Sequence, residues 1–140
     1  MARGFTIIEI TIAIGFILLV ATLGLATDFD SYRRYAFYTN RTILVTALRS
    51  ARSLALGNVD QEVHGVHVDV LGTTLFHGTL YASSSPKNEF FPFTIPVTQA
   101  LGADVVFSQL VGTTTGVVLV ITDGVRRATT TITYEGAILW

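Results

Sequence analysis

The sequence predicts an α+β fold in which one long N-terminal helix packs on a small antiparallel β-sheet domain. Three observations support this prediction. An uncharged apolar run extends from Ile10 to Thr27, small and aliphatic residues then recur at helical spacing as far as Leu56, and from Glu62 onward apolar and polar residues alternate. We therefore expect four segments: a short leader over residues 1–4, an apolar helix over 5–27, an amphipathic helix over 28–57 and a β-rich domain over 58–140.

The composition restricts the class of protein. The chain has 140 residues, which is enough for one domain. Half of the residues are hydrophobic and only 14% are charged, so the chain is too apolar to be disordered. A net charge of −1 gives no general electrostatic attraction to nucleic acid. The absence of cysteine excludes thiol catalysis, disulfides and cysteine-ligated metals.

The apolar run near the N-terminus has the length of a short membrane span. The 18 residues from Ile10 to Thr27 carry no charge, which matches the lower end of what a helix needs to cross a bilayer. Arg3 precedes the run and Asp28 follows it, so we place the N-terminus inside and the remainder outside. A plain single-span anchor is one alternative. A secretory signal cleaved after Gly24-Leu25-Ala26 is another.

The residues before the apolar run read Arg3-Gly-Phe-Thr-Ile-Ile-Glu9, and they closely resemble the processing signature of type IV prepilins and pseudopilins. In that family a short basic leader ends in Gly, a prepilin peptidase cuts after it, and the new N-terminal Phe is N-methylated. Gly4 and Phe5 occupy those two places, and Glu9 occupies the fifth mature position, where the family has Glu. Many members also have a Pro late in the span. Residues 22–26 contain none, so we expect no sharp kink.

Glu9 is the most informative residue of this segment. A carboxylate costs about 2.5–3.5 kcal/mol in the middle of a membrane helix and less near its end, and a simple anchor gains nothing from it. In a filament, Glu9 can pair with the ammonium group of a neighbouring Phe5. Such a pair is a good device for fixing register, so we hypothesise that Glu9 sets the axial stagger between subunits.

The helix is expected to continue to Leu56. Ile43, Ala47, Ala51 and Leu54 recur at helical spacing, and Gly57-Asn58 is a suitable end. Unbroken from residue 5, such a helix would be about 78 Å long. A domain of the remaining residues cannot bury it, so its apolar half needs lipid or other subunits. Aromatic and basic residues at 32–38 indicate a membrane-interface belt.

Six or seven short antiparallel strands are expected after the helix. Turns are predicted at Gly72-Thr73-Thr74, Asp123-Gly124 and Glu135-Gly136. Pro92 and Pro96 indicate an edge or irregular strand. The strands are predicted at 62–70, 75–81, 90–97, 105–111, 116–122, 126–134 and 137–140.

This order of elements resembles the H-type pseudopilins and the related FimT-like minor pilins. Their long helix is followed by strands only, ending in a Thr-rich hairpin, a glycine turn and a short last strand, as in Gly116 to Trp140. Leu71 to Leu101 matches no family pattern. The resemblance implies a structural subunit, a minor pilin or pseudopilin of a type IV pilus or a type II secretion pseudopilus.

The resemblance also implies partners and a location. The partners are other pilin or pseudopilin subunits, a prepilin peptidase and an inner-membrane assembly platform. The subunit would cross the bacterial inner membrane once, with an extracytoplasmic head, before it joins the filament. The alternative is a membrane-anchored or secreted binding module that does not polymerise. The N-terminal residue of the mature protein distinguishes these functions.

One group of residues resembles a metal site. His67 and Asp69 share a face of one predicted strand, and the hairpin would place His77 opposite Asp69, a set that can bind a transition metal. A solvated cross-strand set is the favoured interpretation, and His64 is placed on the other face. Ser83-Ser84-Ser85 has no base at a motif spacing, so we expect no enzymatic activity and no cofactor.

Arg126 and Arg127 are the candidate DNA contacts, because some FimT-like minor pilins bind DNA through a basic C-terminal motif. Adjacent strand residues point to opposite faces. Two charges then give only a weak, salt-sensitive phosphate contact. A solvated strand is favoured, and DNA is an unlikely partner.

Overall fold

A computed structural model describes residues 4–101 and 104–140, and the side chains of residues 23–28 and 99–101 lie outside this description. The described residues form two compact units, an N-terminal unit that ends at Tyr35 and a C-terminal unit, Ala36–Trp140. Helix α1 (Ile7–Leu56) begins in the first and ends in the second. The predicted α+β class, with an N-terminal helix and antiparallel strands, is confirmed.

In the N-terminal unit, the Thr6 side chain caps the start of α1. Thr6 and Glu9 have the Thr-x-x-Glu spacing, and the Glu9 backbone N–H faces the Thr6 hydroxyl at 3.4 Å and the Thr6 carbonyl at 3.1 Å. We expected residues 5–27 to span a membrane. Among the described residues, no helix is both long enough and apolar enough to do so.

In the C-terminal unit, one face of α1 forms the centre of the core. Leu44, Leu48 and Ala51 are fully buried, and Ile43 and Leu54 pack at the edge of the same cluster, as the helical spacing predicts. Phe37 also packs in this core. Its place in an interface belt was therefore predicted wrongly.

The end of α1 follows the predicted stop signal. The Gly57 N–H donates to the Ser53 carbonyl at 2.9 Å, and Asn58 adopts a left-handed conformation with φ 51°. A short 3-10 helix, η1 (Val59–Gln61), then leads into the strands. Asn58, rather than Gly57, is the left-handed residue of the helix cap, and Asn tolerates this conformation.

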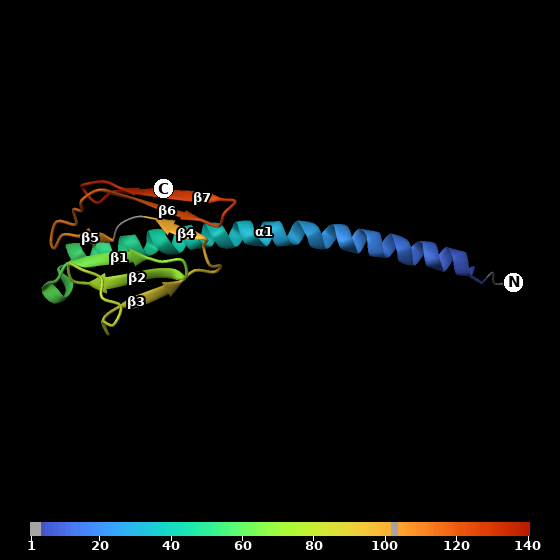
Figure 1. Cartoon of the computed structure of the whole chain (residues 1–140), viewed down its shortest axis with the longest axis horizontal. Coiled ribbons are helices and arrows are strands. Elements are labelled where there is room, and N and C mark those ends of the chain that lie inside the picture. The colour runs from blue at the N-terminus through green and yellow to red at the C-terminus, as the bar shows by residue number, and fades with distance from the viewer. Residues whose placement is uncertain (1–3, 102–103) are drawn as a thin grey trace. The chain divides into compact units, whose positions relative to one another are not determined.

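The strands form two four-stranded antiparallel sheets, where the sequence predicted one small sheet of six or seven strands. The first has the order β3-β2-β1-β5 and the second β4-β6-β7-β8. In Figure 1 they lie on either side of the C-terminal half of α1. The bounds are β1 (His64–Val68), β2 (Gly72–His77), β3 (Glu89–Pro92), β4 (Gln99–Leu101), β5 (Val105–Phe107), β6 (Val117–Thr122), β7 (Arg127–Ile132) and β8 (Ile138–Leu139).

The first hairpin turns two residues earlier than predicted. Val70 and Leu71 form its loop, because the backbone N–H groups of Asp69 and Gly72 each donate to the other residue's carbonyl, at 2.9 and 3.4 Å. Gly72 is therefore the first residue of β2 and not a turn residue. A Cβ there would lie 2.5 Å from the Phe91 carbonyl oxygen, so the close approach of β3 requires glycine.

The other predicted elements hold in part. β3 is an edge strand, as its prolines indicated, and hairpin turns occur at Asp123-Gly124 and Glu135-Gly136. β5 has three residues instead of seven. β4 was not predicted. The loop before β4 is held by Asn40 of α1, whose amide donates to the Ile95 carbonyl and accepts from the Thr94 N–H, both at 2.7 Å.

Candidate functional site

The residues of the N-terminal motif lie at the start of α1. Gly4 and Phe5 precede the helix, and Glu9 lies in its first turn. Gly4, Phe5 and Glu9 line one shallow hollow together with Thr6. A Cβ on Gly4 would meet nothing within 4 Å, and Phe5 is 79% exposed. The backbone between these two residues is therefore open to approach.

Glu9 is surrounded by exposed apolar side chains of its own helix. No hydrogen bond or ion pair to its carboxylate occurs among the described residues, and Ile8 and Ile10 on either side are 68% and 49% exposed. The large exposed apolar residues from the motif to the end of the described side chains are Phe5, Ile7, Ile8, Ile10, Ile12, Ile14, Phe16, Ile17, Leu18, Leu19 and Val20.

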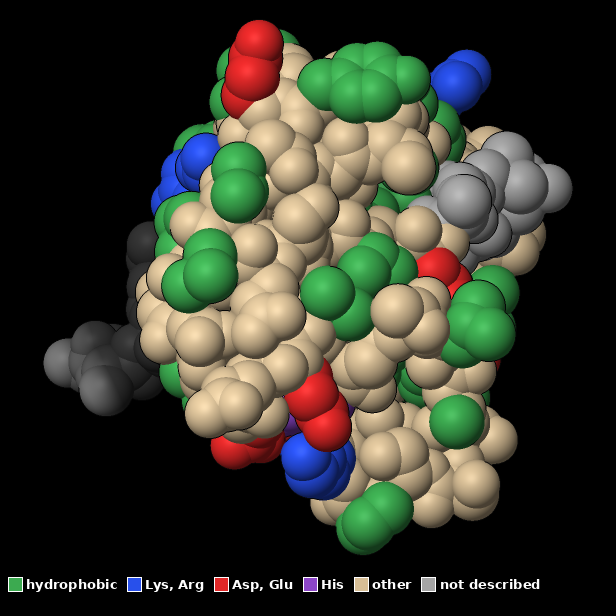
Figure 2. Space-filling view, turned by 90° about the vertical axis from the view of Figure 1, so that its left-hand side faces the viewer, with side chains coloured by type: hydrophobic (Ala, Val, Ile, Leu, Met, Phe, Trp, Pro, Cys, Tyr) green, Lys and Arg blue, Asp and Glu red, His purple; other side chains and the backbone are tan. Residues whose placement is uncertain are grey.

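These apolar residues occupy every face of the helix. Consecutive positions from Ile17 to Val20 are each more than half exposed, so they cannot form the single stripe of an amphipathic helix. A helix that is apolar all round is normally a buried one. The C-terminal unit differs, since apolar and charged side chains are scattered over the face of it that Figure 2 shows.

The three residues of the candidate metal site do not meet. The Nδ1 atom of His67 lies 2.7 Å from Oδ1 of Asp104, and its ring stacks on Tyr81. Asp69 lies in the hairpin loop, where it accepts the Val70 N–H at 2.6 Å. His77 pairs with His64. No group of three potential metal ligands occurs within residues 4–101 and 104–140.

The earlier turn explains this correction. With Val70 and Leu71 as the loop, His67 lies opposite Thr74, and His77 moves to the far end of the hairpin opposite His64. Directly opposed residues share a face of the sheet, whereas residues three apart on one strand do not. His77 therefore lies on the face of His64, away from His67.

A histidine pair that the sequence did not predict results from this register. The rings of His64 and His77 contact edge to face with centroids 4.5 Å apart. His64 is fully buried, and neither of its ring nitrogens has a hydrogen-bond partner. Burial lowers the pKa of His64 below its usual value, and nearby His77 lowers it further. His64 therefore favours its neutral form.

Charged groups border this pair on its open side. Nδ1 of His77 lies 3.5 Å from Oδ2 of Asp60, and Lys87 bridges Asp60 and Glu62 at 3.6 and 3.4 Å. Asp60 has a left-handed conformation with φ 55°. The lysine pairs with both carboxylates, so this cluster is an ion-pair network.

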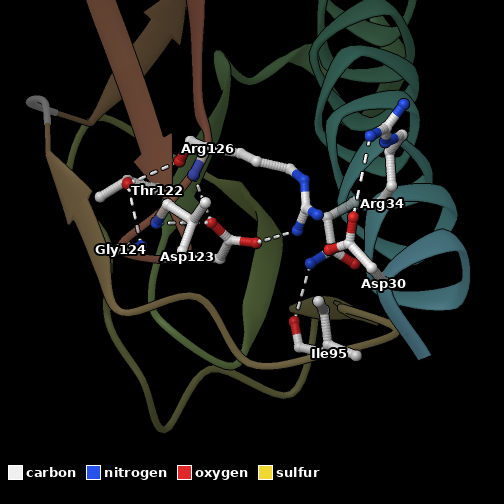
Figure 3. A network of polar contacts seen from close by, with 9 residues as sticks. Asp30, Arg34, Ile95, Thr122, Asp123, Gly124 and Arg126 are labelled. Carbon is white, nitrogen blue, oxygen red and sulfur yellow. Dashed lines mark hydrogen bonds and ion pairs between the residues drawn. The ribbon is translucent and has the colours of Figure 1, made fainter. Parts of the chain in front are cut away.

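The two candidate DNA contacts have different surroundings, and Figure 3 shows the loop that contains the first. Arg126 makes an ion pair with Asp123 at 3.0 Å, and its side chain is only 18% exposed. Burial acts to raise the pKa of Asp123, but hydrogen bonds from Arg126 and Val125 outweigh it, so the pKa is lowered. Arg127 begins β7 and is exposed. The two arginines do not form one basic surface.

Comparison with known proteins adds no further constraint on the site. No protein-family model, curated protein or solved structure matches this chain. The resemblance to pilins therefore rests on Gly4, Phe5, Glu9 and the order of elements in the sequence. The Thr6 cap could have been found from the same residues, because Thr-x-x-Glu before an apolar run is the signature of a capped helix start.

Proposed function

We propose that this chain is a minor pilin or pseudopilin, a structural subunit of a type IV pilus or a type II secretion pseudopilus. In this proposal a prepilin peptidase cleaves between Gly4 and Phe5, the new N-terminus of Phe5 is methylated, and α1 then assembles with the helices of other subunits. The observation that carries the proposal is the apolar surface of α1 from Phe5 to Val20, exposed on every face.

This surface needs a cover that the chain does not supply. Burying one large apolar side chain is favourable by about 1.5–3 kcal/mol, so leaving so many exposed in water is strongly unfavourable. Lipid before assembly and neighbouring helices after it would both provide the cover. The uncharged run in the sequence extends to Thr27, which supports the proposal of a single membrane span with an extracytoplasmic C-terminal unit.

Glu9 supports assembly over simple anchoring. Its carboxylate has no partner among the described residues, and covering the surrounding side chains with apolar groups would leave it without water. A cation from another subunit would remove that cost. The freed amino group of a neighbouring Phe5 has the required charge, and the pair would fix the axial position of one subunit against the next.

The first test is the N-terminal residue of the mature protein, determined by mass spectrometry of protein made with its prepilin peptidase. We expect methylated Phe5. Retention of Met1 or Ala2 would indicate a simple anchor, and a start at Thr27 would indicate a secretory signal; either result overturns the proposal.

The second test separates the charge of Glu9 from the size and polarity of its side chain. Glu9→Gln keeps the size and polarity of the side chain and removes only the charge, whereas Glu9→Ala removes the whole carboxyl group. Both variants should insert into the membrane normally and fail to enter filaments, as measured by co-purification with the other subunits. Normal incorporation of Glu9→Gln would contradict the ion pair.

A further inference from the structure

A small pocket lies within the C-terminal unit, beside α1 and next to Trp140, which follows β8. It has a volume of about 190 Å³. Tyr38, Thr42, Thr46 and Arg49 line it at successive turns of α1, because residues three or four apart share a helix face. Arg41 also lines it, and Trp140 forms the opposite wall.

The pocket has two positively charged side chains, Arg41 and Arg49, and no acidic side chain among its described lining residues. Neither guanidinium makes an ion pair with a carboxylate in the described part of the chain. Guanidinium groups remain protonated at all accessible pH values. The field in the pocket therefore favours an anion.

Hydrogen-bond donors in the pocket are also in excess. The Nε–H of Arg41 is buried and has no hydrogen-bond partner. A buried donor without a partner is destabilising, and more so when it belongs to a charged group. An oxyanion in the pocket would supply both the missing acceptor and the missing negative charge.

Arg49 is held in position before any ligand binds. Its guanidinium carbon lies over the ring of Trp140, 4.2 Å from the ring centroid, which is a cation–π contact. Such a contact uses the face of the guanidinium group, while its N–H donors lie in the plane of the group. The contact therefore fixes Arg49 and leaves it able to bind an oxyanion.

The size of the pocket restricts the ligand. Its volume equals that of about six water molecules and is smaller than that of pockets for drug-sized ligands. We propose that this pocket binds a small oxyanion group, a phosphate or a carboxylate, through Arg41 and Arg49. This site is distinct from the N-terminal motif and does not depend on the proposed assembly function.

The pocket contains its own spectroscopic probe, because Trp140 is the only tryptophan in the chain. The experiment titrates full-length protein in a non-ionic detergent with inorganic phosphate and, separately, with acetate, at ionic strength held constant with chloride. We expect a saturable change in Trp140 fluorescence. Saturation by phosphate alone indicates a phosphate site, saturation by acetate alone indicates a carboxylate site, and saturation by both indicates a site that accepts either group.

Two variants test the residues. Arg41→Gln should weaken binding about tenfold or more, because one charge-assisted hydrogen bond is lost, and Arg49→Gln should do the same. Arg127→Gln is the matched control: it removes one exposed arginine outside the pocket and should leave the affinity unchanged. Affinities rather than amplitudes are compared, since Arg49→Gln alters the fluorescence of Trp140 itself.

A measurement on the wild type alone completes the test if a variant does not fold. Iodide is an anionic quencher and acrylamide a neutral one, so a bound oxyanion should reduce quenching of Trp140 by iodide more than by acrylamide. A response that does not saturate, equal weakening in Arg127→Gln, or equal protection from both quenchers would overturn the proposal.

Discussion

The buried histidine His64 makes the stability of the C-terminal unit depend on pH. It is fully buried, both of its ring nitrogens lack partners, and its pKa is lowered first by burial and then by His77. A proton on His64 would place a buried charge in the sheet, which nearby Asp60 and Glu62 offset only in part. Acidification should therefore destabilise the folded unit, in the range where the unfolded histidine begins to bind a proton.

The sign and size follow from linkage. In the unfolded chain the pKa of His64 is near 6.5, and in the folded chain it is lower. Between these values the unfolded state binds more protons, so the free energy of unfolding falls as the pH falls. At one pH unit below the unfolded-state pKa, a histidine that stays neutral in the folded state lowers the free energy of unfolding by about 1.4 kcal/mol. Above the unfolded pKa this contribution is fully present.

The assay is denaturant unfolding of the full-length chain in non-ionic detergent, followed by Trp140 fluorescence at about pH 7.5 and about pH 5.5. The free energy of unfolding of the wild type should be about 1 kcal/mol lower at the lower pH. His64→Leu replaces the histidine by an apolar group and should lose less, whereas His67→Gln, on the opposite face of the sheet, should retain the His64 contribution. Equal losses in the wild type and His64→Leu, or no loss in the wild type, would refute this reasoning.

Three further outcomes are expected. Gly136→Ala should lower the free energy of unfolding by about 2–4 kcal/mol, because φ is 75° and the new Cβ would lie 2.1 Å from the Gly112 carbonyl oxygen. Gly78→Ala is also at positive φ but in open space, so it should lower the free energy of unfolding less in the same assay. Asp123→Ala should lower the free energy of unfolding by about 1–3 kcal/mol, since it leaves the Val125 and Arg126 N–H groups without their acceptor. A similar loss of stability should occur in the wild type when acidification protonates Asp123, at a pH below its ordinary pKa of 3.8. Zinc should leave the melting temperature unchanged, and a rise would show that the folded chain binds zinc.

Local pattern in the sequence predicted the elements that depend on neighbouring residues. The buried face of α1, its end near Gly57, the turn at Asp123-Gly124 and the edge position of β3 all follow from spacing, backbone preference or a missing N–H group. These features hold because each is decided within a few residues. The N-terminal motif is also local, and its proposed role in processing and assembly rests on the sequence together with the exposure of the residues around it.

The tertiary structure decided whatever depends on partners distant in the sequence. A shift of the first hairpin loop to Val70-Leu71 separated His67 from His77 and joined His77 to His64. Turn propensity could not predict this shift, because the contact of Gly72 with β3 required glycine inside a strand. Likewise, the pairing of strands into two sheets and the meeting of Arg49 with Trp140 follow from packing on α1. Hydrophobic burial is non-directional, so the sequence pattern predicted the buried stripe of α1, and only chain packing decided which buried residues meet.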